Sequence, residues 1–178
     1  MPTSAERPRD GASLVLRAVP YDDPVAQLLV ERVQQEYVQR YGGRDEAVVH
    51  PGDFEPPAGA FLVAEVDGEA AGCGAWRLLP SGEAEIKRVY VEPAHRRRGL
   101  ARVIMAALED SAARAGHRSV VLNTGQEQPE ALVLYDRLGY RPVPGYGVYA
   151  CAPDAVFLGR DLGQRAGTED EKGNTWAS

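Results

Sequence analysis

The chain has 178 residues, 44% of them hydrophobic, which suits a single domain with a sizeable core. Its net charge of −6 argues against general nucleic-acid binding, and no signal peptide or membrane-length apolar run is present, so we expect neither export nor a membrane span. Cys73 and Cys151 are the only cysteines and form no disulfide framework, so we expect reduced thiols in a cytoplasmic protein.

The N-terminal part of the chain predicts a strand and one core-facing helix. Residues 1–12 are polar and contain proline, and we interpret them as a mobile leader that precedes a strand over residues 13–19. Asp23 can cap a helix with Pro24 at its first position, and Gly42 can end it. The apolar residues expected along its buried face are Val25, Leu28, Leu29, Val33, Tyr37 and Tyr41.

A loop and a hairpin come next. Residues 44–59 are rich in proline and predict a shaped loop or one short turn. Residues 61–66 and 70–79 are typical strands, and the Asp67-Gly68 pair between them is a hairpin turn signal.

The strand expected over residues 83–91, EAEIKRVYV, departs from strict alternation. Its apolar residues Ile86 and Val89 are three positions apart, which is the spacing that one extra residue would cause. We therefore predict a β-bulge near Lys87 or Arg88.

A glycine turn and a helix follow this strand. Pro93 stops the pairing, Gly99 lets backbone N–H groups approach a ligand, and a helix runs from there to Gly116. Because the first N–H groups of a helix lack internal partners and the helix dipole adds positive potential, the turn predicts a phosphate site. The segment 87–102 is strongly basic, which suits a small polyanion, although a solvated charge run is the alternative.

The C-terminal part predicts further strands around a second helix. Residues 119–123, SVVLN, read as a buried strand, and a helix follows from Pro129 to Gly139. Residues 140–143 and 155–162 are expected to be the last two strands. The loop between them is rich in Gly and Tyr and is able to close over a ligand. Residues 163–178 are charged, and we interpret them as a disordered tail.

Two motifs carry a family resemblance. The turn reads Arg96-x-x-Gly99-x-Ala101, and the second helix reads Ala131-x-x-Leu-Tyr135-x-x-x-Gly139-Tyr140. Both resemble signatures of the GNAT superfamily of N-acetyltransferases, and the resemblance covers residues 13–162. It implies an α/β fold: a mixed, twisted sheet of six or seven strands, with helices on both faces and a splayed, bulged central strand. It also implies acetyl transfer from acetyl-coenzyme A to a primary amine by direct attack.

The resemblance also implies roles for particular residues. The residues expected to contact the coenzyme are Val89, Tyr90, Val91, Arg96, Arg97, Arg98, Gly99, Leu100, Ala101, Arg102 and Asn123. Tyr135 is the candidate general acid, with a plain core aromatic as the alternative. Glu85 is the candidate base, with a wet strand face formed with Glu83 and Lys87 as the alternative. Gln128 departs from the asparagine often found seven residues before the tyrosine. Phe54, Glu55, Tyr146 and Tyr149 are candidates to line the acceptor site.

Other chemistries lack support in the sequence. His50, His95 and His117 are isolated, so we expect no metal, and Cys73 within a strand is expected to be inert. The acceptor is predicted to be a small-molecule amine, and a protein amine remains open. A non-catalytic module that binds acyl-coenzyme A is the rival function, and a nucleic-acid binder is remote. A homodimer is expected only from the resemblance.

Overall fold

The computed structural model describes residues 11–163. The predicted leader and tail therefore lie outside the described residues, except for Gly11, Ala12 and Gly163. The strands are β1 (Leu14–Ala18), β2 (Gly59–Val66), β3 (Glu69–Leu78), β4 (Ala84–Val91), β5 (Ser119–Gly125), β6 (Arg141–Pro142) and β7 (Ala155–Asp161). The α-helices are α1 (Pro24–Tyr41), α2 (Leu100–Arg114) and α3 (Pro129–Arg137), and short 3-10 turns are η1 (Pro51–Phe54), η2 (Pro93–His95) and η3 (Gly147–Tyr149).

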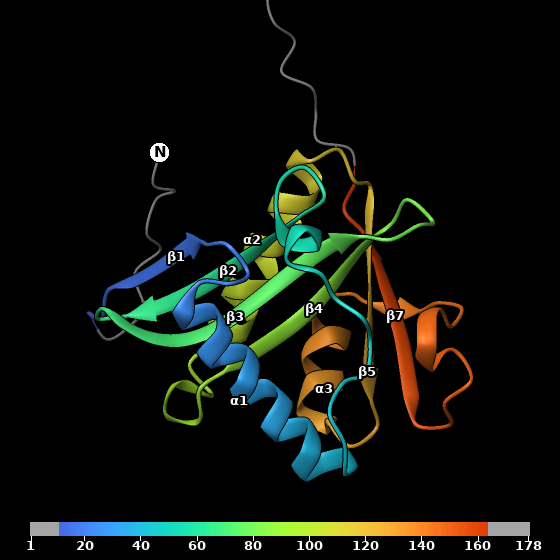
Figure 1. Ribbon diagram of the computed structural model, residues 1–178, viewed down its shortest axis with the longest axis horizontal. Coiled ribbons are helices and arrows are strands. Elements are labelled where there is room, and N and C mark those ends of the chain that lie inside the picture. The colour runs from blue at the N-terminus through green and yellow to red at the C-terminus, as the bar shows by residue number, and fades with distance from the viewer. Residues whose placement is uncertain (1–10, 164–178) are drawn as a thin grey trace, which may run out of the picture.

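The strands form one mixed sheet of seven strands in the order β1-β2-β3-β4-β5-β7-β6 (Figure 1). All neighbouring pairs are antiparallel except β4 and β5, which run parallel. The crossover between the parallel pair is made by α2, as a parallel connection requires. The α/β fold with a mixed sheet predicted from the sequence is confirmed.

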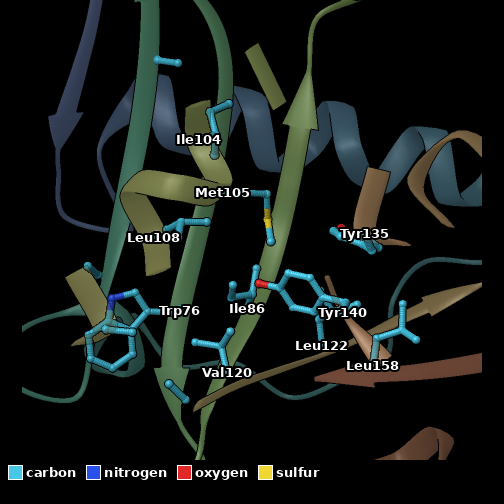
Figure 2. Close-up of a cluster of buried hydrophobic side chains, with 14 of the residues drawn as sticks. Trp76, Ile86, Ile104, Met105, Leu108, Val120, Leu122, Tyr135, Tyr140 and Leu158 are labelled. Atoms are coloured by element: carbon cyan, nitrogen blue, oxygen red, sulfur yellow. The ribbon is translucent and has the colours of Figure 1, made fainter. Parts of the chain in front are cut away.

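Helices cover both faces of the sheet, as predicted. On one face, α1 and η1 enclose a core that includes Leu29, Val33, Phe54, Phe61, Val63 and Cys73. On the other face, α2 and α3 enclose a second core with Trp76, Ile86, Ile104, Leu108, Leu122 and Tyr140 (Figure 2). Among the described residues, no helix is long and apolar enough to cross a membrane.

The α1 helix begins and ends where its sequence predicts, but it is rotated from the expected face. The Asp23 carboxylate accepts from the Val25 and Ala26 N–H groups at 2.8 and 3.2 Å, and Gly42 closes the helix at φ 76°. Its buried residues are Ala26, Leu29, Val30, Val33 and Gln34. Leu28 and Tyr41, expected on the buried face, are 48% and 41% exposed, and Ala26, Val30 and Gln34 are buried instead.

The predicted bulge is present in β4. Cys73 pairs with Tyr90 and Ala75 with Lys87, so β4 uses one more residue than β3 over this stretch. The bulge lies at Arg88, whose φ is 59°. Beyond it, β4 leaves β5: their pairing runs only from Ala84 to Ile86 on the β4 side, although both strands continue.

Candidate active site

A cavity of about 380 Å³ opens where β4 and β5 part. Its walls come from the C-terminal end of α1 with the following loop, from the two parting strands, and from the loop around η3. The residues that line it include Tyr37, Tyr41, Arg44, Asp45, Lys87, Arg88, Asn123, Gln128 and Tyr149. The cavity therefore joins segments that are far apart in the sequence, and Figure 1 shows the loop after α1 running beside β5.

The glycine turn before α2 leaves backbone donors free. The Arg96 N–H donates to Pro93 O and the Val103 N–H donates to Gly99 O. Between them, the N–H groups of residues 97–102 donate to no acceptor within the described part of the chain. Gly99 has φ 81°, a conformation that L side chains rarely adopt, and open space lies where a Cβ would stand. Free donors at a helix N-terminus are suited to an anion, and the phosphate site expected at this turn stays a prediction.

The arginines of the turn have different surroundings. Arg96 is committed to the protein, because its Nη2 bonds Glu36 of α1 at 2.7 Å and its Nε donates to Val91 O at 2.9 Å. Its guanidinium also lies 5.7 Å from the centre of the Tyr90 ring. Arg97, Arg98 and Arg102 are exposed. The turn is thus tied to α1 through Arg96, while the exposed arginines are available to an anion.

The predicted coenzyme strand offers mainly its backbone. Val89 and Val91 pack against the α2 core, and Tyr90 is buried in the α1 core. Since these side chains serve the two cores, a ligand beside residues 89–91 meets main-chain atoms and the wall across from them. Asn123 of β5 lines the cavity, whereas residues 89–91 are not among its lining residues.

Glu85 lies on the α1 side of the sheet and is only 3% exposed. Arg77 Nε donates to its Oε2 at 2.9 Å, and Lys87 Nζ lies 3.8 Å from its Oε1. Burial and the neighbouring Glu85 carboxylate raise the pKa of the Tyr146 hydroxyl. Glu83 is exposed, but Glu85 is not, so the alternative of a wet strand face does not hold for Glu85.

Tyr135 lies in the core on the other side of the sheet. It is 7% exposed, and its ring centre is 5.6 Å from that of Tyr140 (Figure 2). Burial raises its pKa to about 12, so the phenol stays protonated at neutral pH. Glu85 and Tyr135 thus approach the parting strands from opposite faces, and neither lines the cavity itself.

Of the four candidate acceptor residues, Tyr149 lines the cavity and the other three do not. Phe54 is 1% exposed and packs with Tyr21 and Phe61, at ring distances of 5.0 and 6.2 Å, so it is a core residue and lines no part of the cavity. Glu55 is exposed outside the cavity. Tyr146 packs against Phe157 near Glu85.

Tyr149 is the candidate acceptor residue that lines the cavity. Its hydroxyl donates to Asp45 Oδ1 at 3.0 Å and accepts from the Glu46 N–H at 2.6 Å. This pair of bonds joins the η3 loop to the loop after α1. At the same rim, Gln128 Nε2 donates to the Tyr41 hydroxyl at 3.0 Å, so Gln128 has a protein partner.

An ionic cluster in the cavity wall was not predicted. Asp45 Oδ2 contacts Lys87 Nζ at 3.3 Å and Arg88 Nη1. Burial raises the pKa of Asp45, but the charges of Lys87 and Arg88 and the Ala47 N–H outweigh it and lower the pKa to about 2. The bulge was a usable signal for Lys87 and Arg88, because a bulge places neighbouring side chains on one face. Asp45 lies in an irregular loop that carries no such signal.

The remaining reactive side chains offer no second site. Cys73 is buried, burial raises its pKa, and its thiol donates to the Arg88 carbonyl at 3.2 Å, which matches the inert role expected. Within residues 11–163, no group of three or more His, Cys, Asp or Glu side chains is placed to hold a metal ion.

Comparison with known proteins identifies the family. The model of the acetyltransferase (GNAT) family matches residues 26–140. The IAA acetyltransferase of Azospirillum brasilense is 29% identical over 149 residues, covering 83% of this chain and 97% of that protein. A Klebsiella pneumoniae protein assigned as an acyl-CoA N-acyltransferase has a similar structure, with a TM-score of 0.71, 29% identity and coverage of 84% of this chain and 97% of that one.

A more distant structure shows the same fold with a ligand. YncA of Salmonella typhimurium, solved with its cofactor acetyl-CoA, has a TM-score of 0.63 at 22% identity, covering 86% of this chain and 96% of that one. The family match spans α1, the bulged strand, the glycine turn and α3. The chain therefore belongs to the GNAT family and is an acetyl-CoA-dependent N-acetyltransferase.

Proposed function

We propose that this acetyltransferase moves the acetyl group of acetyl-CoA directly to the primary amine of a small molecule, without a covalent enzyme intermediate. The observation that carries the proposal is the cavity at the parting of β4 and β5. The ionic cluster around Asp45 forms part of its wall, and the glycine turn with its free N–H groups follows the C-terminal end of β4.

The chain has hydrogen-bond donors suited to the phosphates of the coenzyme. The N–H groups of residues 97–102 are suited to hold a pyrophosphate, and exposed Arg97 and Arg98 add positive charge beyond them. The backbone of residues 89–91 then guides the pantetheine arm toward Asn123. When bound, acetyl-CoA supplies an acetyl group activated as a thioester.

Glu85 and Tyr135 are proposed to handle the protons. Glu85 accepts a proton from the acceptor's amine, directly or through water, because an amine attacks a carbonyl only in its neutral form. Tyr135 donates its phenolic proton to the departing sulfur, a role that requires a phenol protonated at neutral pH, as the pKa of Tyr135 keeps it. Their approach from opposite faces of the sheet suits an acceptor on one side of the thioester and a leaving group on the other.

Two further observations support the remaining parts of the proposal. The bonds from Tyr149 to Asp45 and Glu46 bridge the cavity rim and favour a small acceptor over a protein segment. The buried, inert Cys73 supports direct attack. Because Cys73 and Cys151 are both unpaired, we place the reaction in the reducing cytoplasm.

The test combines binding and turnover on one sample. Thermal melting with and without saturating acetyl-CoA is followed by a free-thiol assay across a panel of small amines. A ligand that binds only the folded state raises the melting temperature, and thiol release then reports transfer. A shift together with acceptor-dependent thiol release is expected. No shift, or a shift without release from any small amine, would contradict the proposal.

A further inference from the structure

The bulge in β4 brings two neighbouring cations to one carboxylate. Successive side chains of a regular strand point to opposite faces, yet Lys87 and Arg88 both reach Asp45. The extra residue and the φ of 59° at Arg88 produce this arrangement. A positive φ is unfavourable for arginine, so the backbone strain at this position is maintained by its surroundings. The Arg88 side chain is 2% exposed and lines the cavity.

One edge of the Arg88 guanidinium is free. Its Nη1 bonds Asp45, but its Nε is buried without a hydrogen-bond partner, and Nη2 makes no hydrogen bond to the described residues. The Nε/Nη2 edge presents two parallel N–H donors, the geometry that holds a carboxylate in bidentate fashion. A buried donor left unpaired is costly, so this edge is prepared for an acceptor group from outside the described chain.

The two carboxylates near Arg88, those of Asp45 and Glu85, already have partners within the protein. Asp45 accepts from the Tyr149 hydroxyl and the Ala47 N–H on Oδ1, and contacts both cations through Oδ2. Glu85 is bonded by Arg77 at 2.9 Å and contacts Lys87 at 3.8 Å. Neither carboxylate is therefore available to satisfy the free edge.

We propose that the acceptor carries a carboxylate beside its amine, and that this carboxylate binds the Nε/Nη2 edge of Arg88. The inference rests on the proposed function and narrows its acceptor to amino acids and related aminocarboxylates. A neutral amine would leave the buried donors unpaired on binding. The phosphates of the coenzyme have their own donors at residues 97–102, beyond the end of β4.

The test compares acceptors with the same side chain that carry either a carboxylate or a carboxamide beside the amine. Initial rates of thiol release are measured with the full chain, saturating acetyl-CoA, and pairs of amino acids and their carboxamides. We expect kcat/KM to favour the acids by about tenfold or more, because a site built to bond a polar group rejects the analogue that lacks it. Arg88→Lys keeps the positive charge but removes the pair of parallel N–H donors, and should bring the ratio of kcat/KM for acids to that for carboxamides close to one.

Arg44→Lys is the matched control. Arg44 also lines the cavity, but its Nη1 and Nη2 already bond Glu31 at 2.9 and 2.8 Å, so this change should leave the preference for acids intact. Equal rates for acids and carboxamides in the wild type would overturn the proposal. So would an Arg88→Lys variant that slows both classes equally, since Arg88 would then serve the reaction or the fold in general.

A second measurement does not depend on turnover. The melting temperature is recorded with coenzyme A and either N-acetyl amino acids or their carboxamides, the products that the two acceptor classes would give. Stabilisation by the acids alone, lost in Arg88→Lys, supports the carboxylate site even if no acceptor releases thiol, a result that would reject only the proposed function. Equal stabilisation by both classes, or none by the acids, rejects the site. If Arg88→Lys does not fold, the wild-type comparison decides.

Discussion

Arg77 and Glu85 face each other across the register of β3 and β4, and Arg77 Nε donates to Glu85 Oε2 at 2.9 Å. Arg77 also reaches Asp53 of η1 at 3.4 Å and donates to the Val48 carbonyl at 2.7 Å. The proposed base is therefore held by a side chain that also braces the loop after α1. Any change at this pair affects both the chemistry and the shape of the acceptor side.

Replacing the proposed base should slow the reaction without releasing the coenzyme. Glu85→Gln retains a partner for Arg77 but removes the proton acceptor, so we expect kcat to fall by about 10² or more. Glu83→Gln, on the same strand but exposed, should leave kcat unchanged. Steady-state thiol release and the acetyl-CoA melting shift are measured on both variants. An unchanged kcat in Glu85→Gln would remove Glu85 from the mechanism.

Removing the hydroxyl of the proposed acid, Tyr135, should also lower kcat. Tyr135→Phe deletes a hydroxyl that is protonated throughout the neutral range, and we expect a fall in kcat of about 10² with coenzyme affinity nearly intact.

Its neighbour provides the control. The Tyr140 hydroxyl, just before β6, donates to Glu109 of α2 at 2.8 Å. Tyr140→Phe should cost about 1.5–3 kcal/mol of unfolding free energy, typical of a hydrogen bond to a charged group, while kcat changes little. If the two variants show the reverse pattern, the assignment of the acid fails.

A charged side chain at Gly99 in the glycine turn should abolish the binding of acetyl-CoA. Gly99→Glu forces an L residue into φ 81° and places a negative charge beside the free N–H groups, so we expect the acetyl-CoA melting shift to disappear. Gly82→Glu is the control, because Gly82 has φ 91°, equally open surroundings and no contact with the site. Both variants should lose about 1–2 kcal/mol of stability, but only Gly99→Glu should lose coenzyme binding.

Asp45 should make folding stability depend on pH in the acid range. Its pKa in the folded protein is about 2, below the usual 3.8, so its charge stabilises the fold above pH 4, and this stabilisation is lost as the pH falls toward 2. Asp45→Asn should therefore lower the free energy of unfolding at pH 7 by about 2 kcal/mol.

The difference from wild type should shrink as the pH falls through this window. Denaturant unfolding at pH 7, 4 and 3 measures it. Asp136→Asn, whose carboxylate is 81% exposed, controls for the loss of a surface charge. A constant difference across this range would show that Asp45 stabilises the loop by its shape and not by its charge.

The sequence by itself determined the elements and the features that depend on neighbouring residues. The Asp23 cap, the Asp67-Gly68 hairpin, the bulge near Arg88 and the glycine turn before α2 all follow from the steric and hydrogen-bonding needs of a few consecutive residues. These needs hold wherever the segment lies in the fold. The order of strands and helices then indicated the sheet, because a parallel pair requires a crossover helix.

Only the tertiary structure decided what surrounds the cavity. Asp45 meets Arg88 from 43 residues away and Tyr149 from 104 residues away, and Phe54 turns into the core where it packs with Tyr21 and Phe61. The rotation of α1 that exposes Leu28 was settled in the same way, by packing against the sheet. Such contacts depend on how irregular loops close between distant elements, and no local periodicity encodes that closure.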